Sequence, residues 1–72
     1  MAEKKLAIKT DFIRLDALLK FSGIAQTGGE AKIIIQEGEV SVNGEVNQMR
    51  GKKCWPGDRV EVSGVSIFIE KG

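Results

Sequence analysis

The segment Thr27–Gly44 reads TGGEAKIIIQEGEVSVNG, and it contains local signals for a helix followed by a hairpin. Thr27 and Glu30 have the spacing of a capping box, in which the threonine hydroxyl accepts a hydrogen bond from the glutamate amide. Apolar residues follow at helical spacing, at Ala31, Ile34 and Ile35. Gly38 is a residue type that ends helices, because glycine adopts the left-handed backbone conformation easily. We therefore predict a helix that begins after Thr27 and ends after Glu37.

The second half of this segment has the alternating pattern of a strand. Val40 and Val42 are separated by a polar residue, which predicts a strand with one buried face. The pair Asn43–Gly44 is the strongest short signal for a two-residue hairpin turn, and Val46 resumes the apolar pattern after it. We predict a tight antiparallel hairpin at this point of the chain.

Upstream of this segment, the spacing predicts another helix over residues 11–21. Asp11 is placed as its N-cap, and Gly23 stands where the helix would end. Asp16 and Lys20 would form an ion pair on the outer face, one helical turn apart. The inner face would carry Phe12, Leu15, Leu18 and Leu19. Because only a short loop separates the two helices, we expect them to pack together.

Downstream, Pro56–Gly57 predicts a turn, followed by alternating strands at residues 59–62 and 65–69. Residues 47–53 are polar and basic, and we expect them to be irregular. An edge strand over residues 4–9 is also predicted. One apolar face would consist of Val40, Val42, Val46, Val60, Val62, Ile67 and Ile69. The fold class is therefore α+β, with two packed N-terminal helices against a small antiparallel sheet.

The composition excludes several classes of function. The 72 residues are enough for one domain, residues 1–72, and the net charge is only +1. The chain has one cysteine, Cys54, and no histidine, which excludes an internal disulfide and a His-dependent catalytic pair. We expect no catalytic residue, no metal and no cofactor. With no signal peptide and no apolar run longer than Ile33–Ile35, we expect a soluble cytoplasmic protein without membrane contact.

The basic residues gather around the predicted start of the second helix. Gly28–Gly29 would leave the helix amides open to an anion, and Lys32 lies one turn further on. The loop Arg50–Lys53 has three cations and no acid, while Arg14 and Lys20 come from the first helix. The alternative is that the glycines relieve crowding between the helices and that the cations are ordinary solvated surface.

Two further residues have open interpretations. Positive neighbours would lower the pKa of the Cys54 thiol, whereas a semi-buried structural role would leave it inert. Trp55 has the chemistry to stack on a nucleic-acid base. Its position before Pro56–Gly57 is somewhat more typical of a residue that packs at the edge of a sheet.

An ordered set of motifs resembles a known family. The motifs are Arg14-Leu15-Asp16, Leu18-Leu19, residues 27–32, residues 35–44 and residues 57–60. Together they resemble the RNA-binding domain of ribosomal protein S4, the alpha-L motif, and most of all its short stand-alone YbcJ/YaaA-like members. The resemblance covers about residues 11–62 and implies two packed helices against a small, strongly bent antiparallel sheet.

The resemblance also implies a function and a binding surface. The family binds structured RNA, often ribosomal, so we expect a role in ribosome assembly or translation for a monomeric, non-catalytic protein. The implied RNA-binding residues are Arg14, Lys20, Thr27, Gly28, Gly29 and Lys32, extended by Arg50, Lys52 and Lys53 of the basic loop. The family often has Ser-Arg where this chain has Thr27–Gly28, so one bidentate phosphate contact is missing.

Two alternatives come from other classes of protein. A ubiquitin-like sulfur carrier has a similar size, but such proteins begin with a hairpin and end in Gly-Gly, whereas this sequence ends in Lys71–Gly72. A protein-interaction module would use Trp55 and Phe68, since Phe68 is out of phase with the buried face of its strand.

Overall fold

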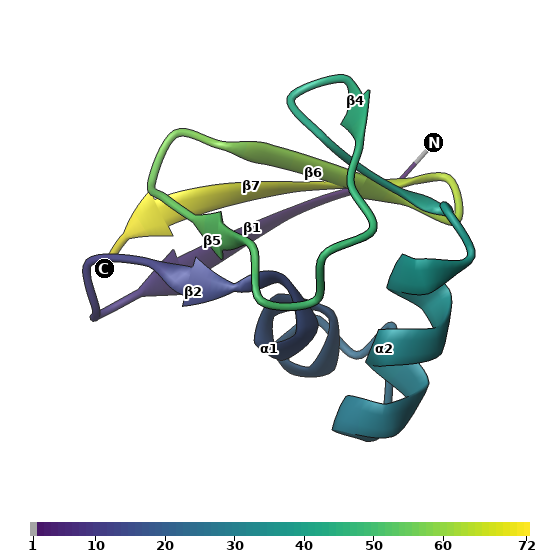
Figure 1. Cartoon of the computed structure of the whole chain (residues 1–72). Coiled ribbons are helices and arrows are strands. Elements are labelled where there is room, and N and C mark those ends of the chain that lie inside the picture. The colour runs from purple at the N-terminus through teal and green to yellow at the C-terminus, as the bar shows by residue number, and fades with distance from the viewer. Residues whose placement is uncertain (1) are drawn as a thin grey trace.

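The structure is a computed structural model that describes residues 2–72 (Figure 1). Two helices cover one face of a five-stranded sheet with strand order β1-β7-β6-β3-β4, and a separate two-stranded ribbon joins β2 to β5. The elements in chain order are β1 (Ala2–Ile8), β2 (Ile13–Arg14), α1 (Leu15–Phe21), α2 (Gly28–Gln36), β3 (Val40–Val42), β4 (Glu45–Val46), β5 (Lys53–Cys54), β6 (Arg59–Val62) and β7 (Val65–Lys71).

Helix α2 forms as its local signals predict. The Thr27 hydroxyl accepts a hydrogen bond from the Glu30 amide at 3.1 Å. Gly38 follows the helix with a φ of 78°, in the left-handed region that favours glycine. Ala31 and Ile35 are fully buried and Ile34 is partly buried against the core, so these residues form the inner face of the helix as predicted.

Helix α1 begins four residues later than predicted, and Asp11 is not its N-cap. Arg14 takes the N-cap position with extended backbone, because Ile13–Arg14 pairs with Lys53–Cys54 as a short ribbon. The amides of Leu15 and Asp16 donate to the carbonyls of Lys52 and Arg50, at 2.9 and 3.1 Å. A loop distant in the sequence therefore caps this helix. Phe12 precedes the helix and is not part of the inner helical face on which its spacing had placed it.

The hairpin and the central antiparallel strands are confirmed. Asn43 and Gly44 both have positive φ, 52° and 88°, as a type I′ turn requires. Val46 is an exception to the predicted apolar face, since it is 62% exposed. The two-residue turn pairs Val46 with Ser41 rather than with a buried valine, and this register places it on the solvent face.

The first strand corrects two further expectations. The predicted edge strand near residues 4–9 exists as β1, but it is parallel to β7, so the sheet is mixed rather than antiparallel. Strands β1 and β2 also precede the helices, which are therefore not strictly N-terminal. Apolar periodicity does not indicate whether two strands run parallel or antiparallel. The long connection from β1 to β7 permits both arrangements.

The core lies between the helices and the sheet. Its largest fully buried side chains are Leu15, Leu18, Leu19, Ile35, Val40, Val60 and Ile67. In Figure 1 the loop after β4 runs from the sheet to the start of α1 and returns as β5. Neither helix within residues 2–72 is long and apolar enough to cross a membrane.

Candidate nucleic-acid interface

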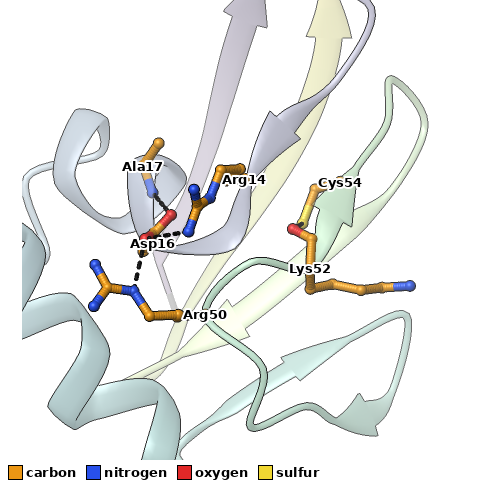
Figure 2. Close-up of polar contacts among 6 residues, drawn as sticks. All are labelled: Arg14, Asp16, Ala17, Arg50, Lys52 and Cys54. Carbon is orange, nitrogen blue, oxygen red and sulfur yellow. Dashed lines mark hydrogen bonds and ion pairs between the residues drawn. The ribbon is translucent and has the colours of Figure 1, made fainter.

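A nearly buried carboxylate organises the start of α1. Asp16 is 8% exposed, and its Oδ2 accepts hydrogen bonds from Arg14 Nη2 at 3.2 Å and from Arg50 Nε at 3.0 Å (Figure 2). Its Oδ1 accepts from the Ala17 amide at 2.8 Å. The predicted outer pair between Asp16 and Lys20 is therefore wrong, because the loop after β4 brings Arg50 to the carboxylate instead.

The two arginines are held but remain accessible. The side chains of Arg14 and Arg50 are 55% and 41% exposed to solvent, whereas the side chain of Asp16 is only 11% exposed. A guanidinium has five N–H donors, so a single bond to Asp16 leaves most of its capacity for another ligand. We call Arg14, Asp16 and Arg50 the Asp16 cluster; it carries one net positive charge.

The start of α2 lies against this cluster. A β-carbon at Gly28 would be 3.7 Å from Arg50 Nη2, and a β-carbon at Gly51 would be 3.7 Å from Arg14 Nη2. A shallow depression is lined by Arg14, Asp16, Ala17, Lys20 and Gly28. The fold therefore brings together cations from three separate segments and the glycine-rich start of a helix.

The remaining predicted residues are distributed around this centre. Lys32 is exposed on α2, one turn after Gly28 and therefore on the same side of the helix. Gly29 and Thr27 are exposed at the helix start. Lys52 lines a different recess, with Val42, Asn43, Glu45 and Asn47, and its side chain points away from the Asp16 cluster in Figure 2. Lys53 lies over the Phe12 ring, at 4.9 Å from its centroid.

Cys54 has a structural role. Its side chain is fully buried, and its thiol lies 3.8 Å from the Lys52 carbonyl. The pKa of the Cys54 thiol is raised to about 11, chiefly by burial and also by the negative charge of Asp58, while Lys52 opposes the shift. The alternative of a thiol activated by its basic neighbours is therefore wrong.

Sequence reasoning missed the organising role of Asp16. Its spacing to Lys20 suggested an exposed pair, and only the resemblance, through Arg14-Leu15-Asp16, singled out this segment. The ion pair with Arg50 joins residues 34 positions apart, and such a contact cannot be predicted from the periodic spacing of residues in the sequence.

Comparison with known proteins identifies the family. The family model described as "S4 domain" matches residues 6–70. The chain belongs to the S4 domain family. The alpha-L resemblance seen in the sequence is thereby confirmed.

Two known proteins are similar to this S4 domain over most of their length. "Probable ribosome maturation protein RlbA" of Bacillus subtilis (strain 168) is 41% identical over 63 residues, which cover 88% of this chain and 89% of that protein. "Putative RNA-binding protein YbcJ" of Escherichia coli (strain K12) is 37% identical over 61 residues, or 85% and 87% of the two chains.

A solved structure shares the fold. The solution structure of YbcJ from E. coli, described as revealing an alpha-L motif involved in RNA-binding, matches with a TM-score of 0.68 and 36% identity. The match covers 97% of this chain and 87% of that one. This S4 domain therefore has the two helices and sheet of the alpha-L fold, here with a five-stranded mixed sheet.

Proposed function

We propose that this S4 domain is a non-catalytic protein that binds structured ribosomal RNA and acts in ribosome assembly or translation. In this proposal residues 1–72 work as one RNA-binding domain, as a monomer in the cytoplasm. The observation that carries it is the Asp16 cluster, which holds Arg14 and Arg50 beside the start of α2. The relatives' names, a ribosome maturation protein and an RNA-binding protein, support the same class of partner.

The chemistry of the surface suits the RNA backbone. The major groove of A-form RNA is too deep and narrow for side chains, so proteins recognise phosphates, 2′-hydroxyls and unpaired loops. The first amides of α2 carry partial positive charge, and the Thr27 hydroxyl already accepts from the Glu30 amide. The amides of Gly28 and Gly29 are thus suited to a phosphate oxygen, which can approach them without meeting a side chain.

The proposed contact surface has a centre and an extension. Its centre consists of Arg14, Lys20, Thr27, Gly28, Gly29, Lys32 and Arg50. Lys52 and Lys53 extend it on the other side of the basic loop. Four cations in the centre would neutralise about four phosphates, so log affinity would fall against log salt with a slope of about −3 to −4.

A matched pair of charge reversals tests this proposal with purified ribosomal RNA as the probe. The double variant Lys20→Glu/Lys32→Glu reverses two central cations. The control Lys5→Glu/Arg59→Glu makes the same change in net charge. Lys5 and Arg59 both pair with Phe68 and are exposed, whereas the next pairs in the register contain buried Ile69 and buried Val60; Lys5 and Arg59 therefore lie on the sheet face away from the helices.

Fluorescence anisotropy across a salt series gives the affinity and its salt slope. We expect the central variant to lose at least about tenfold in affinity and about two units of slope, because each phosphate contact contributes nearly one unit. The control should lose much less. Equal losses in the two variants would reject the proposed surface, and absence of binding by the unmodified protein at low salt would reject the function.

A further inference from the structure

The ribbon formed by β2 and β5 has one buried face and one outward face. Ile13 and Cys54 are directly paired and are 8% and 0% exposed, so they anchor the ribbon to the core. Neighbouring side chains on a strand point to opposite faces, which directs the flanking residues outward. On one side of the buried pair, Arg14 lies opposite Lys53.

On the other side of the buried pair the outward residues are aromatic. Continuing the register by one residue brings Phe12 opposite Trp55, and their ring centroids are 5.3 Å apart with an interplanar angle of 48°. The ammonium group of Lys53 lies 4.9 Å from the centroid of the Phe12 ring. The outward face thus combines two rings with the cations of Lys53 and Arg14.

The tryptophan side chain is exposed, and its backbone is held by two hydrogen bonds to Asp58. Trp55 is 48% exposed, although it is the chain's only tryptophan and among its largest apolar residues. Its amide donates to Asp58 Oδ2 at 2.8 Å, and its carbonyl accepts from the Asp58 amide at 2.9 Å. A rigid aromatic surface that is left half exposed does little for the core and is well prepared for a ligand.

We propose that Phe12, Lys53 and Trp55 form a stacking platform for one unpaired base of the bound RNA. This inference rests on the proposed function, because the RNA backbone must lie on the Asp16 cluster for the base to reach the platform. Arg14 belongs to both features: it binds Asp16, and it lies opposite Lys53 on the ribbon. Arg14 and Phe12 are two positions apart in extended chain, a distance of about 7 Å.

The charges around the platform favour a nucleotide over an apolar protein segment. Every base presents a π-face that stacks on aromatic side chains, and flanking cations take the adjacent phosphates. The nearby acids are already engaged: Asp58 binds the Trp55 amide and Asn43, and Asp11 pairs with Lys71 at 3.5 Å. The platform therefore extends the cationic surface with the one element that the Asp16 cluster lacks, a recognition site for a base.

Three synthetic RNA probes separate stacking from backbone binding. The first is a blunt RNA duplex, the second is the same duplex with single-stranded adenosine tails at its ends, and the third has abasic tails of equal length. Abasic tails keep the sugar-phosphate charge and remove the base. The proteins compared are the unmodified chain, Trp55→Ala, and Trp55→Phe, which retains a ring against Phe12.

We expect Trp55→Ala to lose about fivefold to 100-fold in affinity for the adenosine-tailed duplex, the range measured for removing one base–aromatic stack. Its affinity for the blunt and abasic probes should change less than twofold, and its salt slope should not change. Trp55→Phe should keep most of the affinity. In the unmodified protein, fluorescence of the single tryptophan should be quenched by the adenosine-tailed probe and much less by the abasic one.

Two kinds of failure are distinguishable. If the unmodified protein binds the probes but Trp55→Ala weakens all three equally, or none, the platform is rejected while RNA binding stands. Unchanged tryptophan fluorescence on saturation with the tailed probe would reject it as well, and would favour a protein partner at Trp55. If the unmodified protein binds neither these probes nor ribosomal RNA, the proposed function fails and the platform with it.

Discussion

Arg50 in the loop after β4 lies 3.0 Å from the carboxylate of Asp16 at the start of α1, and this ion pair connects residues 34 positions apart. The carbonyls of Lys52 and Arg50 in the same loop accept hydrogen bonds from the amides of Leu15 and Asp16. The basic loop therefore forms the cap of α1. Helix, loop and cationic surface depend on one another through Asp16.

Replacing Asp16 should destabilise the fold. In Asp16→Ala, the Ala17 amide and two guanidinium groups lose their acceptor, and the nearly buried site cannot be fully rehydrated. Because both arginines are about half exposed, we expect a loss of about 1–3 kcal/mol rather than the larger cost of a fully buried pair. Urea denaturation measures the difference. The control Glu39→Ala, at an exposed position, should change the free energy of unfolding by less than about 0.5 kcal/mol. If the two variants lose similar amounts of stability, the role given to Asp16 is contradicted.

The variant Asp16→Asn separates preorganisation from net charge. It makes the protein more positive by one charge, which by itself would strengthen binding to ribosomal RNA. We expect affinity to fall by about 2- to 10-fold instead, since Arg14 and Arg50 lose a charged anchor and must be ordered on binding. Anisotropy titration at fixed salt measures this change. An increase in affinity would show that charge alone governs the surface.

Gly28 is a position where binding can be strengthened. A β-carbon there meets Arg50 at 3.7 Å, an ordinary contact, so a side chain can be accommodated. Gly28→Arg adds a guanidinium at the helix start, and we expect tighter binding to ribosomal RNA and a salt slope steeper by about 0.7–0.9. Gly28→Gln is the uncharged control and should leave the slope unchanged. If Gly28→Gln steepens the salt slope, or if Gly28→Arg leaves it unchanged, the RNA backbone does not lie at the start of α2.

The buried thiol predicts a pH dependence at alkaline pH. The pKa of Cys54 is about 11 in the folded protein, above its ordinary value of 9.0, so the fold favours the protonated thiol. This stabilisation is complete below pH 9 and is lost as pH rises towards 11, because the unfolded chain ionises first. Urea denaturation at pH 8 and pH 10 should show a steeper loss of stability in the unmodified protein than in Cys54→Ala. Equal slopes would mean that the thiol is not desolvated.

The same burial predicts slow chemistry at Cys54. We expect the thiol to resist alkylation by iodoacetamide in the folded protein at pH 8 and to react freely in urea. Mass spectrometry of the adduct over time measures both rates. Rapid alkylation without denaturant would contradict the closed packing of β2 on β5.

Local signals predicted local structure well. The cap at Thr27, the left-handed Gly38 and the turn at Asn43–Gly44 each involve residues within a few positions of one another, and each is found as predicted. The solvent-facing Val46 was also accessible from the sequence, since a two-residue turn pairs it with Ser41. Counting the register from the turn, rather than following apolar alternation, gives the correct face.

The sequence by itself determined helix α2, the hairpin, the buried stripe of the central strands and the family to which the chain belongs, because all of these follow from short-range spacing and residue type. Only the tertiary structure decided where α1 begins, that β1 is parallel to β7, and that Asp16 joins Arg14 to Arg50. These features depend on which distant segments meet once the core has closed. A carboxylate at helical spacing pairs with a neighbouring lysine only when no arginine is brought closer by the fold.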